Sequence, residues 1–190
     1  MPTGVILAGP NGAGKTTVAE DLILGALGIR DFVNADTIAL GLSRFDAYEA
    51  RGRARQVQDE WLRDLIASNR DFAFETTLAS MRWEKTVRDA QGIGMTMDLH
   101  FLWLPSADDS VNRVNMRVEA RGHPIPEDII RGRYVAGLQN LVSLYMPLMD
   151  RWYVYDSSST GLPVIAQGGL GLEIDVRKAE LFETILGVRK

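Results

Sequence analysis

A glycine-rich segment near the N-terminus constrains the fold of this chain more than any other feature of its sequence. The run from Gly9 to Thr16 fits the pattern G-x-x-x-x-G-K-[ST]. It follows the apolar residues 5–8, which predict a short buried strand, and it leads into a helical pattern over residues 15–19. A strand, a glycine loop and a helix in this order predict an α/β fold whose loop binds phosphate groups at a helix N-terminus.

This loop offers the groups that the phosphates of a nucleotide require. Glycines let the backbone curl until its N–H groups point at an anion, and the helix adds roughly half a positive charge at its first turn. Lys15 would reach the β- and γ-phosphates, and the Thr16 hydroxyl would bind the accompanying Mg²⁺. We therefore predict ATP and Mg²⁺ as cofactors; a glycine-rich turn with an incidental lysine is the structural alternative. The predicted nucleotide site comprises Gly9, Pro10, Asn11, Gly12, Ala13, Gly14, Lys15, Thr16 and Thr17.

The rest of the chain continues this alternation of strands and helices. Further strands are predicted over residues 31–35, 72–74, 95–104, 152–155, 163–166 and 172–176, with a glycine loop at residues 168–171. Helices are predicted around the apolar positions Ala50, Ala54, Val57, Trp61 and Leu65, over residues 82–91 and 106–121, from about Ile130 to Tyr145, and at the end near Gly187. The alternation predicts a three-layer α/β/α fold with a mostly parallel central sheet.

Length and composition narrow the domain organisation and the classes of function. A chain of 190 residues without a linker predicts one domain, residues 1–190, with a helical lid at about residues 106–133. The balance of 21 Lys and Arg against 25 Asp and Glu argues against nucleic-acid binding. The absence of cysteine excludes disulfides, thiolate metal sites and cysteine nucleophiles. With only residues 5–8 as an apolar start, we expect a cytoplasmic protein without a membrane span.

Two acidic residues follow predicted strands at the edge of the sheet where the phosphate loop lies. Asp36 comes just after the strand at 31–35, where a carboxylate could activate an acceptor hydroxyl. The alternative is that Asp36 caps a short helix over residues 38–42. Glu75 follows the strand at 72–74, a position suited to holding metal-bound water or the acceptor, and its alternative is a solvated strand end. We rank Asp36 above Glu75.

An arginine stripe lies in the predicted lid. Arg113, Arg117 and Arg121 recur at every fourth position, so they share one face of a helix. Such a stripe could close over a transferring phosphoryl group, whereas the alternative is a solvated surface. Arg131 and Arg133 begin the next helix and could join the cluster.

Polar residues elsewhere complete the candidate acceptor site. His123 is a lone loop histidine, and the wide separation of the two histidines of the chain argues against a zinc site. The candidate acceptor-binding residues are Asp36, Glu75, Thr77, His123, Arg131 and Arg133.

Several motifs together resemble the zeta toxin family, particularly its short stand-alone members. They are AGPNGAGKTT, FVNAD, FETTL, RVNMRVEARGHPIPEDIIRGRY and the later NL…Y…D.WYVYD, and they run from about Val5 to Ser158. Members of this family are kinases, and the best-known ones phosphorylate UDP-N-acetylglucosamine on a sugar hydroxyl, which blocks cell-wall synthesis. The resemblance implies a P-loop kinase that acts on a UDP-activated sugar, with an antitoxin protein as a candidate partner.

The resemblance also implies roles for single residues. Lys15 and Thr16 fall on the nucleotide and Mg²⁺ positions. Asp36 falls on the base that activates the sugar hydroxyl, and Glu75 on an acid that contacts the substrate.

The lid and a later segment match the family less closely. Arg113 and Arg117 fall in the lid region and are candidate catalytic residues, whereas Arg121 stands where these short members usually have glycine. Residues 156–158 read Asp-Ser-Ser in place of the more usual Asp-Asn-Ser.

Two other classes of function remain open from the sequence. One is a phosphotransferase for a nucleoside, an antibiotic or a free sugar, because acceptor pockets are built from variable loops. The other is a nucleotide-binding switch whose output is an interaction with a partner.

Overall fold

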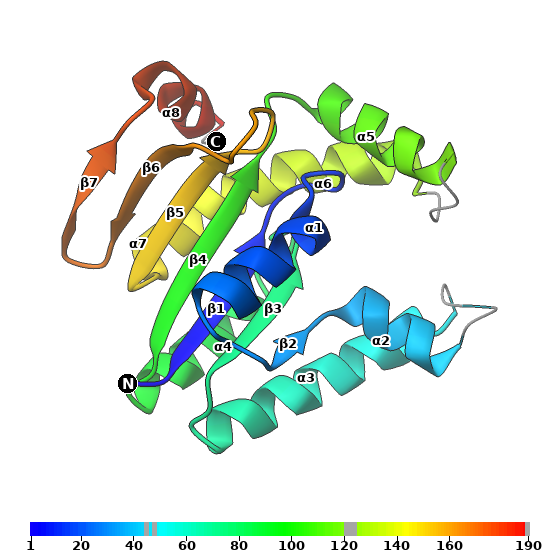
Figure 1. The fold of residues 1–190 in the computed structure, drawn as a ribbon, viewed down its shortest axis with the longest axis vertical. Coiled ribbons are helices and arrows are strands. Elements are labelled where there is room, and N and C mark those ends of the chain that lie inside the picture. Colours follow the sequence, from blue (N-terminus) through cyan, green and yellow to red (C-terminus); the bar gives the residue numbers. More distant parts are fainter. Residues whose placement is uncertain (44–45, 47–48, 120–124, 189–190) are drawn as a thin grey trace.

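The computed structural model describes residues 1–43, 46, 49–119 and 125–188. Seven strands form one sheet with helices on both sides (Figure 1). The strands are β1 (Thr3–Ala8), β2 (Phe32–Val33), β3 (Phe72–Thr76), β4 (Thr96–Trp103), β5 (Arg151–Asp156), β6 (Val164–Gly169) and β7 (Leu172–Val176).

The sheet is mostly parallel, as the alternation of elements predicts. Its strand order is β2-β3-β1-β4-β5-β6-β7, and the first five strands of the chain pair in parallel. Within the described residues, the antiparallel pairs are β5 with β6 and β6 with β7. The carboxyl ends of β1, β2 and β3 therefore meet at one edge, where α/β sheets place their ligands.

Helices connect the first five strands of the chain and line that edge. The first helix, α1 (Lys15–Ala19), continues as a π-helical turn over Glu20–Ala26. A second π-helical segment, Leu141–Tyr145, follows α6. The other helices are α2 (Ala35–Leu42), α3 (Arg51–Ala67), α4 (Trp83–Gly92), α5 (Ala107–Glu119), α6 (Glu127–Asn140), α7 (Met146–Leu148) and α8 (Ala179–Leu186).

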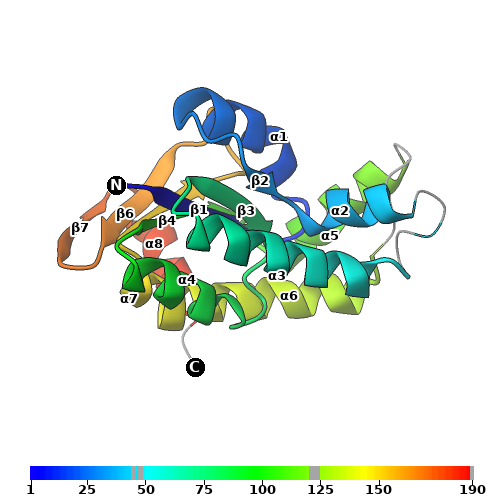
Figure 2. The ribbon, with the colours of Figure 1, turned by 90° about the horizontal axis from the view of Figure 1, so that it is seen from below.

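The core lies on both faces of the sheet because successive side chains of a strand point to opposite faces. Val5 and Leu7 of β1 pack with Ile23, which follows α1, on one face. Ile6 and Phe74 pack on the other face, which α3, α4, α6 and α7 cover (Figure 2). All five side chains are fully or almost fully buried, and each burial contributes about 1.5–3 kcal/mol. This packing holds the edge that carries the phosphate loop.

Three local predictions are wrong. β2 spans only Phe32–Val33, because the chain turns into α2 directly afterwards. The glycines 168 and 169 belong to β6 and not to a loop; a Cβ on Gly169 would lie 2.0 Å from the Asp150 carbonyl oxygen. Trp61 is 41% exposed, and Leu62 takes the buried position expected for Trp61.

Within the described residues no helix has the length and apolar character needed to span a membrane.

Candidate active site

The phosphate loop has the backbone conformation that its glycines predict. Gly9, Gly12 and Gly14 all have positive φ angles, of 146°, 79° and 81°. A Cβ on Gly9 would lie 2.4 Å from the Leu102 carbonyl oxygen, and one on Gly12 would lie 2.8 Å from the Arg113 Cβ. Glycine is therefore required at both positions, by backbone conformation and by close approach.

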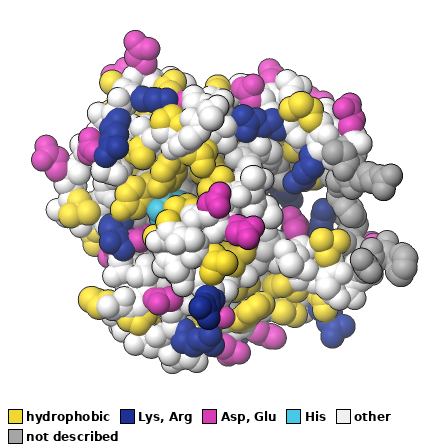
Figure 3. Space-filling view, in the orientation of Figure 1, with side chains coloured by type: hydrophobic (Ala, Val, Ile, Leu, Met, Phe, Trp, Pro, Cys, Tyr) yellow, Lys and Arg dark blue, Asp and Glu magenta, His cyan; other side chains and the backbone are white. Residues whose placement is uncertain are grey.

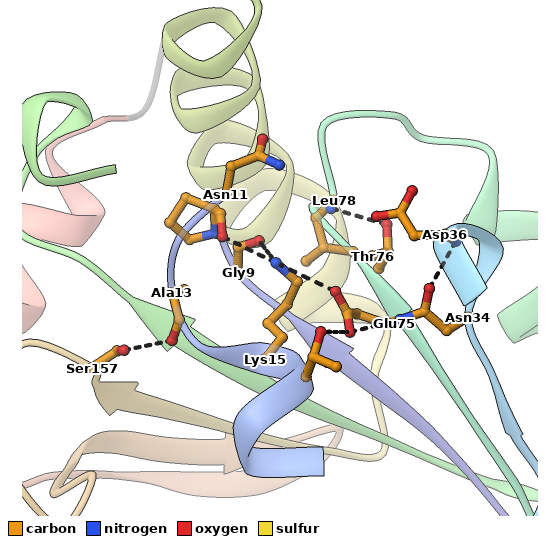
Figure 4. A network of polar contacts seen from close by, with 12 residues as sticks. Gly9, Asn11, Ala13, Lys15, Asn34, Asp36, Glu75, Thr76, Leu78 and Ser157 are labelled. Atoms are coloured by element: carbon orange, nitrogen blue, oxygen red, sulfur yellow. Dashed lines mark hydrogen bonds and ion pairs between the residues drawn. The ribbon is translucent and has the colours of Figure 1, made fainter. Parts of the chain in front are cut away.

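Lys15 lies buried beneath this loop. Its Nζ donates hydrogen bonds to the carbonyl oxygens of Gly9, at 2.9 Å, and Pro10, at 3.0 Å (Figure 4). It also lies 3.8 Å from the Glu75 Oε1. Burial lowers the pKa of Lys15, while the nearby carboxylates of Glu75 and Asp36 raise it. The acidic pair thus favours the ammonium charge that binding phosphates requires.

Glu75 connects three residues of the site. Its Oε2 accepts hydrogen bonds from the Thr16 hydroxyl, at 3.0 Å, and from the Asn34 amide Nδ2, at 2.9 Å. With 14% of its side chain exposed, Glu75 is not a freely solvated strand end. Thr16 and Glu75 together present a hydroxyl and a carboxylate, which are oxygen ligands of the kind that Mg²⁺ prefers.

Asn34 positions the helix that carries Asp36. Its Oδ1 accepts hydrogen bonds from the backbone N–H groups of Asp36, at 2.8 Å, and Thr37, at 3.2 Å. Asn34 is thus the N-cap of α2, and the alternative that Asp36 caps a helix is wrong. Asp36 lies in the first turn, exposed, with its side chain at the cleft. Asn34 was missed from sequence, although an Asn before a helical pattern is a capping signal.

Replacing Asn34 should separate its two contacts. Asn34→Ser keeps a capping oxygen but removes the amide that donates to Glu75, whereas Asn34→Ala removes both. We expect Asn34→Ala to cost about 1 kcal/mol more unfolding free energy than Asn34→Ser in urea titrations. Equal stability of the two variants would contradict the capping role.

A cleft of about 590 Å³ brings most of the predicted residues together. Figure 3 shows Lys and Arg side chains on the right of the molecule, in the region between α5 and α2. The predicted residues that line the cleft are Asn11, Gly12, Gly14, Lys15, Thr16, Thr17, Asp36, Glu75, Thr77, Arg113, Arg117 and Arg133.

Arg131 does not line the cleft. Its guanidinium pairs with Glu127 at 2.7 Å and with Asp108 at 2.6 Å, so it links α6 to α5 on the surface. Arg121 and His123 fall outside the described residues.

The two described lid arginines differ in their contacts. Arg113 donates to the Ser157 carbonyl oxygen at 2.9 Å and approaches the Gly12 carbonyl oxygen at 3.5 Å. On the same helix, the Ser110 hydroxyl donates to the Asn11 carbonyl oxygen. These contacts tie α5 to the phosphate loop. Arg117 is exposed, lines the cleft and forms no hydrogen bond or ion pair with the described part of the chain, so its guanidinium is available to an anion bound in the cleft.

Asp156 shapes a turn that supports the loop. Its carboxylate accepts hydrogen bonds from the Ser158 N–H, at 3.0 Å, the Ser159 hydroxyl, at 2.8 Å, and the Lys178 Nζ, at 2.9 Å. The adjacent Ser157 hydroxyl donates to the Ala13 carbonyl oxygen at 2.6 Å. Burial alone would raise the pKa of Asp156, but these bonds hold it well below its usual range. The turn at residues 156–158 therefore braces the phosphate loop through Ser157.

Asp156→Asn should make stability less dependent on pH. Because the folded pKa is lowered, the Asp156 carboxylate stabilises the fold above its unfolded pKa of about 3.9, and this is lost as pH falls toward the folded pKa. We expect the variant to lose about 2 kcal/mol at pH 7. Urea titrations at pH 7 and pH 3 should show the gap narrowing at the lower pH. A gap that stays constant would contradict this account.

Comparison with known proteins identifies the fold. No protein-family model and no curated protein sequence matches this chain. Among solved structures, a chain of the AvrRxo1-ORF1:AvrRxo1-ORF2 complex with ATP matches with a TM-score of 0.74 and 18% identity over 100% of this chain. A chain of the PezAT toxin-antitoxin system of Streptococcus pneumoniae matches with a TM-score of 0.69 and 15% identity, covering 99% of this chain and 86% of that one. This protein has a P-loop kinase fold.

One further solved structure, that of a kinase, agrees. The fold is therefore the one that the zeta toxin resemblance implies. A gluconokinase from Sinorhizobium meliloti matches with a TM-score of 0.51 and 14% identity, over 98% of this chain and 90% of that one. This chain spans only about 65% of the length of the AvrRxo1 chain that it matches.

Proposed function

We propose that this protein is an ATP- and Mg²⁺-dependent kinase that transfers the γ-phosphate to a hydroxyl group of a small molecule. The leading acceptor is a UDP-activated sugar such as UDP-N-acetylglucosamine. One observation carries the proposal: Lys15, beneath the phosphate loop, and the exposed carboxylate of Asp36 line the same cleft. The similar AvrRxo1 complex that was solved with ATP supports ATP as the phosphate donor.

Each step of the transfer has a residue suited to it. The loop amides and Lys15 bind the β- and γ-phosphates, and Arg117 adds positive charge where charge develops on the transferring group. Asp36 accepts the proton as the acceptor hydroxyl oxygen bonds to the γ-phosphorus. The bond between that phosphorus and the β–γ bridging oxygen breaks, and ADP leaves.

The residues around Thr16 fit a magnesium ion. Mg²⁺ bound to nucleotides usually needs only one or two protein oxygens, because the phosphates and water supply the rest. The Thr16 hydroxyl would bind the ion, and Glu75, 3.0 Å from that hydroxyl, would hold its water ligands. When bound, Mg²⁺ neutralises phosphate charge during the transfer.

The similar solved structures also suggest a protein partner. Two of the similar solved structures come from a two-component complex and from a toxin-antitoxin system. We propose an antitoxin-like protein as a candidate partner of this chain.

An acceptor screen tests the enzymatic proposal. Incubating the protein with ATP, Mg²⁺ and single acceptors, and recording phosphorus NMR spectra, should show ADP and a new phosphate ester for UDP-N-acetylglucosamine. A nucleoside, a free sugar or an antibiotic that is phosphorylated faster would replace it as the acceptor. Binding of ATP without multiple-turnover transfer to any acceptor would favour the nucleotide switch.

A further inference from the structure

One wall of the cleft carries positive charge that no ion pair within the described residues balances. Arg55 of α3 and Arg133 of α6 both line the cleft, and neither forms a hydrogen bond or ion pair with another described residue. Burial lowers the pKa of Arg133, the positive charges of Arg51 and Arg55 lower it further, and the Asp36 carboxylate only partly offsets them. Cations gathered in this way repel one another, and an anion between them would relieve the repulsion.

A buried hydrogen-bond donor lies in the same wall. Arg55 and Gln58 are three positions apart on α3, so they share one face of that helix. Gln58 is only 2% exposed, lines the cleft, and has a buried side-chain Nε2 without a hydrogen-bond partner. An unpaired buried donor costs about 1–3 kcal/mol. A ligand oxygen in the cleft would recover that cost.

This wall is distinct from the phosphate loop but adjoins the proposed base. Arg133 lines the same cleft as Lys15 and Asp36, and its charge interacts with the charges of both. Arg55 of α3 lines this cleft as well, and its charge acts on Arg133. An acceptor whose hydroxyl lies at Asp36 can therefore also contact Arg55 and Gln58 of α3, which do not belong to the phosphate loop.

We propose that Arg55, Gln58 and Arg133 form a subsite for a phosphate or diphosphate group carried by the acceptor. This inference rests on the proposed kinase function and narrows its substrate class. Two guanidinium groups and an amide donor suit the several oxygens of a phosphate ester, and arginine can bind such oxygens in pairs. A neutral sugar, nucleoside or antibiotic would leave the subsite unpaired, so phosphate-bearing acceptors are preferred over these.

Calorimetry on the full chain tests the subsite. With the phosphate loop occupied by Mg²⁺ and a non-hydrolysable ATP analogue, we expect UDP-N-acetylglucosamine to bind and N-acetylglucosamine to bind at least about 100-fold more weakly. Arg55→Ala and Gln58→Leu should each weaken UDP-N-acetylglucosamine binding by about tenfold while leaving affinity for the ATP analogue unchanged. Arg53→Ala, on another face of α3, is the matched control and should change neither.

Two results would overturn the subsite. One is equal affinity for the charged and the neutral sugar; the other is a loss of ATP-analogue affinity in Arg55→Ala, which would assign Arg55 to the donor. Titrating Lys15→Met with pyrophosphate distinguishes a failure of the subsite from a failure of the kinase proposal. The phosphate loop is disabled in that variant. If Lys15→Met still binds pyrophosphate, and if adding Arg55→Ala abolishes that binding, the subsite is supported even without kinase activity. No pyrophosphate binding to Lys15→Met would contradict it.

Discussion

Asp36→Asn is expected to abolish phosphoryl transfer while ATP still binds. Asparagine keeps the size of the side chain in the first turn of α2, and the backbone N–H still reaches the Asn34 cap, so the cleft keeps its shape. The lost carboxylate can no longer accept the hydroxyl proton, which should lower kcat by about 100- to 10,000-fold. Steady-state kinetics with UDP-N-acetylglucosamine, alongside calorimetry with the ATP analogue, would measure both effects.

The matched control for this variant is Asp128→Asn. Asp128 is also an exposed acid in the first turn of a helix, α6, so its replacement removes the same favourable interaction with a helix dipole. It does not line the cleft, and we expect kcat to stay within about twofold of the wild-type value. If Asp36→Asn turned over as fast as Asp128→Asn, Asp36 would have no part in the reaction.

The sequence predicts the centre of the site because that part depends on local rules. A glycine pattern between a strand and a helix specifies the phosphate loop within a few residues. Parallel strands place their carboxyl ends at one edge, so Asp36 and Glu75, each just after or at the end of a strand, converge on Lys15. Both the fold class and this convergence follow from periodicity and topology alone.

The rest of the cleft depends on packing between distant parts of the chain. Arg113 binds the carbonyl oxygen of Ser157, 44 residues away, and no local pattern connects the two. The sequence does not single out Gln58, because the apolar pattern of this helix includes Trp61 and gives no sign that a polar side chain is buried. Only the tertiary structure shows that Gln58 and Arg55 line the same cleft as Arg133.

Lys15→Met is expected to remove both ATP binding and transfer, unlike Asp36→Asn. Methionine has a similar length but cannot donate to phosphate oxygens, and loss of one such donor lowers kcat by about 100- to 1,000-fold. Calorimetry with the ATP analogue should show a parallel loss of affinity. Lys85→Met, which removes an exposed lysine paired with Asp89 at 2.6 Å, is the control and should leave both quantities unchanged.

The fold of Lys15→Met should be no less stable than that of the wild type, and this separates a functional lysine from a structural one. Burial lowers the folded pKa of Lys15, so the charged ammonium disfavours folding at pH 7, and wild-type stability should rise as pH increases from the folded pKa toward the unfolded value of about 10.4. Methionine removes that cost. Thermal unfolding at pH 7 should therefore give Lys15→Met a Tm at or above that of the wild type. A markedly lower Tm would mean that the bonds from Nζ to the loop carbonyls outweigh the cost of burial, and that Lys15 is retained for the fold.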